Sequence, residues 1–326
     1  MKIALTSLAA LLLAMLVPVW AHVIDDPFFV TMATRMIIMA MAVISLGLLV
    51  GFSGLVSFGH AAFFGLGGYT VGILAKHHNE MTNITFLPFS WQGSIEGLIQ
   101  FPLAMIVSGL FAALVGLLSL RTRGVFFIMI TLAFAQMLYH FMISLPTYGG
   151  EDGLSVWQRS TLPFIDLYDD QHFFYLCLAL LIVEIIFLKK LLASPFGVII
   201  RAAAQDEQRL VTLGVPVFRY RLFAFALAGA WAGLSGALAA NLFEFIGPGL
   251  MHWSRSGEML VMIILGGLGS IYGGLAGAIM FIGLEEVLSE KTEHWSLILG
   301  PILILVVLFA RGGLMGALQR FLASKD

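Results

Sequence analysis

The chain alternates between long apolar segments and short polar interruptions, and the length of the apolar segments indicates the fold class. A helix needs roughly 20 mostly apolar residues to cross a bilayer. Because lipid offers no partner for open backbone groups, such segments predict an all-α, polytopic transmembrane helical bundle. About eight full spans are predicted, at 3–20, 32–50, 57–75, 98–120, 125–145, 173–190, 221–242 and 295–310.

Composition supports lipid as the solvent. The 326 residues are 60% hydrophobic and 11% charged, whereas a soluble domain is typically about 25% charged. We therefore predict a single integral-membrane domain over 1–326, with one long polar loop at 194–220. The single cysteine, Cys177, excludes an intrachain disulfide and a cysteine metal cluster.

The charged residues orient the bundle through the positive-inside rule. With the amino terminus inside, most lysines and arginines fall on the cytoplasmic side and most acids fall on the other side. The opposite orientation would place most cations on the wrong side, so we expect a cytoplasmic amino terminus. The apolar run after Lys2 is long for a signal peptide and has a poor cleavage site, which favours a retained helix.

The segment 259–285 is apolar but interrupted by glycines. In this orientation both of its ends are external, and it is too short for two spans of about 20 residues each. We predict two short helices or a glycine-rich re-entrant hairpin that turns at GGLGSIYGG. Irregular backbone at this depth is tolerated only inside protein or beside a polar cavity. The candidate packing or pathway residues are Gly266, Gly267, Gly269 and Gly273.

Glycine pairs spaced four apart also predict close helix packing elsewhere in the chain. The pairs are Gly47 with Gly51 and Gly229 with Gly233.

Several polar side chains fall inside the predicted spans. Ser57 and His60 lie in the small-residue sequence SFGHAAFFG, where a histidine can bond to another helix or line a cavity. Gln136 and His140 lie four apart, near Thr131, and such stripes normally face the bundle interior. Pathway lining and structural hydrogen bonding both remain open for these residues.

Two charged residues lie within the predicted spans. Because a charge inside the bilayer is costly, each should have an oppositely charged partner or reach the aqueous interface. Glu184 is either a coupling-ion site or an acid near the interface that Lys189 or Lys190 relieves. Arg35 is expected to extend its side chain to the external surface.

The sequence contains no motif for enzymatic chemistry. There is no GxxxxGK[ST] phosphate loop, HExxH, GxSxG or CxxC, and the histidines are scattered. We therefore expect no enzymatic activity, no ATP site of the P-loop kind, and no cofactor or metal bound by this chain. The net charge of −2 gives no reason to expect a nucleic-acid partner.

The polar loop, KKLLASPFGVIIRAAAQDEQRLVTLGVPVFRYR, is a basic insert between two apolar segments. Residues 199–213 read as one amphipathic helix, which Gly214 ends and Pro216 prevents from continuing. Such a helix either fits a groove on a soluble partner or lies on lipid headgroups.

The chain resembles the permease subunits of branched-chain amino-acid ABC importers, the LivM-like family. Three blocks carry the resemblance, and RGGLMG at 311–316 follows them. They are GFSGLVSFGHAAFFGLGGYTVGIL (51–74), RAAAQDEQRLVTLGVPVFRYRLFAFALAGAWAGLSGALAA (201–240) and SGEMLVMIILGGLGSIYGGLAGAIMF (256–281). One departure is Ala310, where relatives often have proline.

The resemblance implies a bacterial inner-membrane protein that pairs with a second homologous permease. Two cytoplasmic ATPase subunits would hydrolyse the ATP, and a periplasmic substrate-binding protein would deliver the solute. The family's coupling loop matches 201–214. The implied ATPase-coupling residues are Arg201, Ala204, Asp206, Glu207, Arg209, Leu213 and Gly214.

The predicted function is therefore that of the permease subunit of an ATP-driven importer for small polar solutes, with branched-chain amino acids favoured. A permease for urea or short amides is one alternative. A stand-alone secondary transporter or channel, with Glu184 or His60 as the ion-coupling group, is the other. No residue in the sequence separates these solutes.

Overall fold

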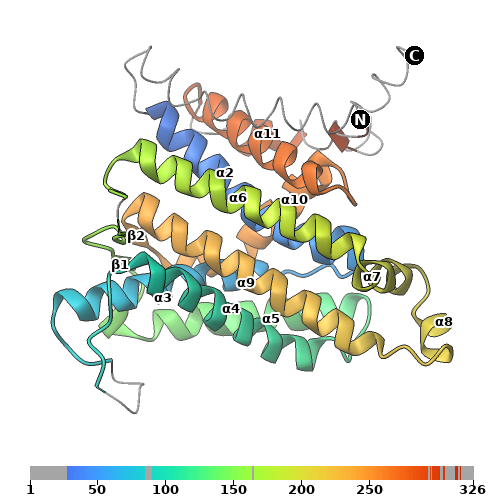
Figure 1. Ribbon diagram of the computed structural model, residues 1–326. Helices are drawn as coiled ribbons and strands as arrows, with labels where there is room; N and C mark the ends of the chain where they lie inside the picture. The colour runs from blue at the N-terminus through green and yellow to red at the C-terminus, as the bar shows by residue number, and fades with distance from the viewer. Residues whose placement is uncertain are drawn as a thin grey trace.

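A computed structural model of the chain describes residues 28–84, 90–163, 165–292, 294, 296–301, 304, 313, 314 and 316 (Figure 1). The predicted span at 3–20 lies outside the described residues, and the one at 295–310 lies mostly outside them. The long helices are α2 (Phe28–Gly47), α3 (His60–Asn79), α4 (Gly97–Ser119), α5 (Val125–Ile143), α6 (Asp170–Ala193), α9 (Val217–Phe243), α10 (Trp253–Gly266) and α11 (Ile271–Ser289). The short elements are η1 (Leu48–Phe52), η2 (Pro146–Tyr148), β1 (Leu154–Ser155), α7 (Pro195–Gln205), α8 (Glu207–Thr212), β2 (Phe245–Ile246) and η3 (Pro248–Met251).

The structure confirms a helical membrane protein. In the described part of the chain, five helices are long and apolar enough to cross a membrane, at 28–52, 97–119, 125–143, 217–243 and 271–289. Helices α3 and α6, of 20 and 24 residues, lie at two of the other predicted spans. The predicted count of eight full spans is not confirmed.

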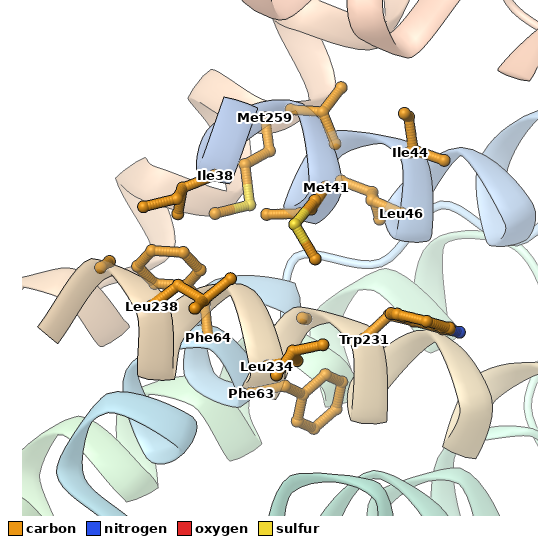
Figure 2. Packing of buried hydrophobic residues seen from close by; sticks show 14 of the residues in the cluster. Ile38, Met41, Ile44, Leu46, Phe63, Phe64, Trp231, Leu234, Leu238 and Met259 are labelled. Carbon is orange, nitrogen blue, oxygen red and sulfur yellow. The ribbon is translucent and has the colours of Figure 1, made fainter. Parts of the chain in front are cut away.

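Helix α9 lies at the centre of the bundle and packs against α2, α3 and α4. Figure 2 shows Trp231, Leu234 and Leu238 of α9 in the apolar core, with Met41 of α2 and Phe63 of α3 on either side. All five side chains are buried. Long apolar side chains fill this core where the helices lie farther apart, and small residues let the backbones approach elsewhere.

The predicted glycine pairs are partly confirmed as packing positions. A Cβ atom at Gly229 would lie 2.3 Å from the Ala112 Cβ of α4, and one at Gly233 would lie 2.3 Å from the Ser108 hydroxyl. Gly51 is equally close-packed, because a Cβ there would lie 2.7 Å from the Gly269 nitrogen. The prediction for Gly47 is wrong, since nothing lies within 4 Å of its Cβ position.

The two ends of the bundle differ (Figure 1). At one, which we call the sheet end, β1 and β2 pair antiparallel, with Leu154 opposite Ile246. There Arg159 bridges the start of α6 and the end of α9, at 2.7 Å from Asp170 and 3.2 Å from Glu244. At the other, which we call the α8 end, α7 and α8 project from the bundle. The α8 end is the cytoplasmic one in the predicted orientation.

Helices α10 and α11 form the predicted hairpin, and its turn falls at 267–270. Helix α10 is short, with 14 residues, but α11 has 19 and reaches spanning length, contrary to the prediction of two short helices. The Lys189 ammonium of α6 donates to the Tyr272 hydroxyl and lies 4.5 Å from that ring's centroid. The turn therefore lies level with the last turns of α6, near the α8 end.

Candidate functional site

The polar loop folds into two helices rather than the single helix predicted over 199–213. Helix α7 ends at Gln205, and Asp206 has an extended backbone, with φ −151° and ψ 95°. The Asp206 carboxylate accepts a hydrogen bond from the Arg209 backbone nitrogen at 3.0 Å. This is an N-cap, which satisfies a free backbone donor at the start of α8. The helical pattern across 199–213 hid this break because a capping aspartate also suits a polar helix face.

Glu207 fixes the start of α8 to the bundle. Its carboxylate lies 2.7 Å from the Arg221 guanidinium of α9 and 3.1 Å from that of Arg123, in the loop before α5. Arg221 also donates to the Ala203 carbonyl of α7 at 3.0 Å. The Arg221 side chain is only 14% exposed and that of Arg123 is 66% exposed. The Arg221 contact is therefore the stronger link, because exposed ion pairs contribute little.

Helix α7 has two further attachments. The Arg201 guanidinium donates to the Leu192 carbonyl at 3.0 Å, near the last turn of α6. Ala204 lies against the loop after η1, since a Cβ at Gly54 would lie 3.3 Å from the Ala204 Cβ. The segment 195–212 is thus tied to α6, α9 and the loop before α5. Helix α7 also packs on the bundle through Ile200 and Ala203, which are 0% and 3% exposed, whereas α8 has no buried residue.

The outer surface of this segment is exposed and carries aliphatic side chains among polar ones. Val198 and Val211 are each 57% exposed and Leu213 is 72% exposed. Arg209 is exposed beside them, and Gly214 has a φ of +78°, which ends the helix as predicted. Exposed aliphatic side chains with a nearby cation, on a segment tied to three helices, suit docking to another protein.

Ser57 and His60 are fully buried at the start of α3. The His60 Nε2 atom lies 2.8 Å from the Ser45 hydroxyl of α2, and Ser57 accepts a hydrogen bond from the Gly59 nitrogen at 3.2 Å. Among the described residues the His60 Nδ1 atom has no hydrogen-bond partner. These contacts place His60 as a link between two helices.

The predicted polar stripe on α5 does not face the interior as a whole. Thr131 is buried and bonds to the Ile128 carbonyl at 2.9 Å, but Gln136 is only half-buried and His140 is exposed. The α5 surface around them is apolar, with Met129 and Met137 exposed. The prediction failed because nine residues rotate by about 180° around an α-helix, so Thr131 and His140 lie on opposite sides of α5.

The four candidate glycines of the hairpin pack backbone against backbone. A Cβ at Gly266 would lie 1.7 Å from the Gly273 carbonyl, and one at Gly273 would lie 2.4 Å from the Gly267 carbonyl. Gly267 and Gly269 have positive φ, +117° and +81°, and form the turn. These contacts favour the packing interpretation over the pathway interpretation for Gly266 and Gly273.

One of the two alternatives for Glu184 is wrong, and Arg35 has a partner that the sequence did not reveal. The Glu184 side chain is fully buried, and neither carboxylate oxygen has a hydrogen-bond partner among the described residues. Lys189 bonds to Tyr272 rather than relieving that carboxylate. Arg35 does not simply extend to the surface, because its guanidinium binds both Glu285 oxygens at 3.0 Å.

Sequence reasoning missed the roles of Arg123, Arg221 and Glu285. Arg123 and Glu207 are 84 positions apart, and Arg35 and Glu285 are 250 apart. No local pattern specifies such pairs. The sequence offered one indication of these ion pairs. Arg123, Arg221 and Glu285 lie near the ends of predicted spans, where charged residues of several helices come together.

Comparison with known proteins gives one consistent result. Residues 28–308 match the family described as "branched-chain amino acid transport system / permease component". The chain is 27% identical to the high-affinity branched-chain amino acid transport system permease protein LivM of Salmonella typhimurium, and equally to that of Escherichia coli K12. In each case the match covers 88% of this chain and 69% of the relative. It is also 30% identical to LivH of Escherichia coli K12, over 38% of this chain and 40% of that one. No solved structure gives a significant match.

Proposed function

We propose, since the chain belongs to the family of permease components of branched-chain amino acid transport systems, that it is a transmembrane subunit of an ATP-driven importer in the bacterial inner membrane. Two cytoplasmic ATPase subunits supply the energy, and a periplasmic binding protein delivers the solute. The observation that carries this proposal is the α7–α8 segment. It exposes Val198, Val211 and Leu213 at the predicted cytoplasmic end, while ion pairs tie it to the bundle.

The contacts of Glu207 suggest how ATPase movement reaches the membrane. Closure of the ATPases displaces the docked α7–α8 segment. The Glu207–Arg221 pair transfers that displacement to α9, which packs against α2, α3 and α4, and the Glu207–Arg123 pair transfers it to the start of α5. Displacement of α9 changes the packing of the whole bundle. This switches the solute pathway between a state open to the periplasm and a state open to the cytoplasm. Glu207 is thus a positioning residue, while Arg209 and Leu213 are free to meet the ATPase.

A second permease completes the pathway. Relatives named LivM and LivH, each described as a permease protein of the same transport system, both match this chain. His140 of α5, which is exposed, supports a protein or aqueous neighbour on that side, because a polar side chain facing lipid is costly. We place the partner permease against the outer face of α5.

Branched-chain amino acids are the favoured solutes, because the matched relatives carry that description. Urea and short amides are alternatives within the same mechanism. A stand-alone transporter is favoured by one observation, the buried Glu184 carboxyl without a hydrogen-bond partner among the described residues.

Reconstitution tests the proposal. The chain is purified with the second permease and the two ATPases from its own gene neighbourhood and placed in liposomes with the binding protein outside. ATP-dependent accumulation of L-leucine, lost when the ATPases are omitted, is the expected result. Accumulation by the purified chain alone, without ATPases, would contradict it. Accumulation of urea or acetamide instead of L-leucine would support the ATP-driven import mechanism and contradict the proposed solute.

A further inference from the structure

Near the sheet end, a cavity of about 210 Å³ lies between α2, α3, α9, α10 and α11. Its volume is below the roughly 300–1,000 Å³ of pockets for drug-sized ligands, so it suits a smaller solute. Its apolar wall includes Ile38, Met39, Phe64, Met259 and Met262. Figure 2 shows Ile38, Phe64 and Met259 close together on three different helices. The methionine side chains form a wall that adapts to branched aliphatic groups.

Charged residues of both signs also line this cavity. Among its described lining residues are two arginines and two glutamates, so their formal charges cancel. Arg35 lies 3.0 Å from Glu285, and Arg255 lies 2.8 Å from Glu258. These side chains are between 18% and 46% exposed, so they remain accessible to solvent and to a solute. Both pairs are on helices that border the hairpin or belong to it.

A lining with two balanced ion pairs discriminates between kinds of solute. A simple anion or cation that entered would pair with one partner and leave the other charge to the solvent, which at these partly exposed side chains has a modest cost. A zwitterion carries both charges, so its carboxylate can bind an arginine and its ammonium a glutamate with no charge left over. The apolar wall then receives the rest of the molecule. An amide or urea has no charge with which to exchange partners.

We infer that this cavity is a solute-binding site for a zwitterionic α-amino acid with an aliphatic side chain. Arg255 and Glu285 bind its two charged ends, and Met39, Met259 and Met262 contact its side chain. The inference deepens the proposed function, on which it rests for the class of protein. It also places a binding step inside this permease chain, at the end that faces the periplasm in the predicted orientation.

Photo-crosslinking tests this inference directly. The probe is L-photo-leucine, a diazirine analogue of leucine, added to the assembled transporter in lipid nanodiscs without ATP. Mass spectrometry then locates the adducts. We expect adducts on the α2 and α10 peptides that carry Met39 and Met259, and competition by L-leucine. The diazirine carboxylic acid that lacks the amino group should give few adducts there.

Cavity filling supplies the matched variants. Met39→Trp places a larger side chain in the cavity and should lower adduct formation about tenfold, because it occupies space that the probe needs. Met137→Trp, at a methionine 53% exposed on α5, is the control and should keep the wild-type level. Both variants are checked for assembly by size-exclusion chromatography. If Met39→Trp fails to assemble, the wild-type adduct map still decides.

The outcomes separate this inference from the proposed function. Adducts absent from the cavity, or unchanged in Met39→Trp, overturn the binding site even if ATP-driven uptake of L-leucine is intact. Adducts that only phospholipid competes away assign the cavity to lipid and also overturn it. Cavity adducts in a protein that shows no ATP-driven uptake would support the binding site and contradict the proposed function as an ATP-driven importer.

Discussion

The α10–α11 hairpin and the α7–α8 segment are both pairs of helices joined by a short break, but they are held in opposite ways. In the hairpin, glycines bring the two backbones into contact, and a Cβ at Gly277 would lie 1.8 Å from the Met262 carbonyl. In the α7–α8 segment, α7 packs on the bundle through buried Ile200 and Ala203, but no residue of α8 is buried, and the Glu207 carboxylate makes its main attachment.

This difference separates a rigid part of the molecule from a movable one. Two helices whose backbones are in contact cannot shift relative to each other without a clash or a void, because close-packed interiors tolerate little change in volume. Ion pairs on long side chains keep their partners over small displacements and exchange with water at modest cost. The hairpin is therefore suited to give the cavity a fixed wall, and the α7–α8 segment to transmit a movement.

The largest effect is expected from filling a hairpin contact. Gly266→Val should force α10 and α11 apart and lower the free energy of unfolding by more than about 3 kcal/mol, since the new side chain meets backbone rather than a flexible side chain. Thermal unfolding of the detergent-solubilised chain measures this. The control is Gly47→Val, at a helical glycine with open space around its Cβ position. It should alter the stability only by the small difference in helix propensity between glycine and valine. Equal loss in both variants would contradict the contrast.

A smaller, functional effect is expected from Glu207→Gln. Loss of the carboxylate leaves the largely buried Arg221 guanidinium without its ion pair, so uptake should fall about tenfold, or 1.4 kcal/mol, and the thermal stability should fall as well. Uptake and ATP hydrolysis in proteoliposomes check this. The exchanged variant Glu207→Arg with Arg221→Glu should recover part of the uptake. Glu80→Gln, at an acid 53% exposed in the loop after α3, is the matched control.

Most of the helical segments could be predicted from the sequence, because the length of an apolar run directly reflects the bilayer thickness. The break at 267–270 was also predictable, since clustered glycines interrupt a run too short for two spans. Asp206 was not, because a capping aspartate and a helix-face aspartate look the same in an amphipathic pattern. The cavity at Arg35 and Glu285 depends on tertiary contact alone, so no local signal could reveal it.

The smallest effect is expected from Arg123→Gln. This guanidinium is 66% exposed, so its pair with Glu207 contributes about 0.2–1 kcal/mol, and uptake should fall by about twofold. The decrease should disappear at high salt, because exposed ion pairs are screened. A loss as large as that of Glu207→Gln would show that α5, rather than α9, carries the movement.

The central claim, that the α7–α8 segment docks on an ATPase, is tested most directly by site-specific crosslinking. Cys177 is fully buried, so a cysteine placed at Leu213 can be labelled selectively with a benzophenone maleimide on the purified chain, before the transporter is assembled. Met81→Cys, at a residue 78% exposed in the loop at the opposite end, is the control. We predict that illumination joins the Leu213→Cys chain to an ATPase subunit and leaves the Met81→Cys chain unjoined. No ATPase adduct from Leu213→Cys, or equal adducts from both positions, would contradict the account.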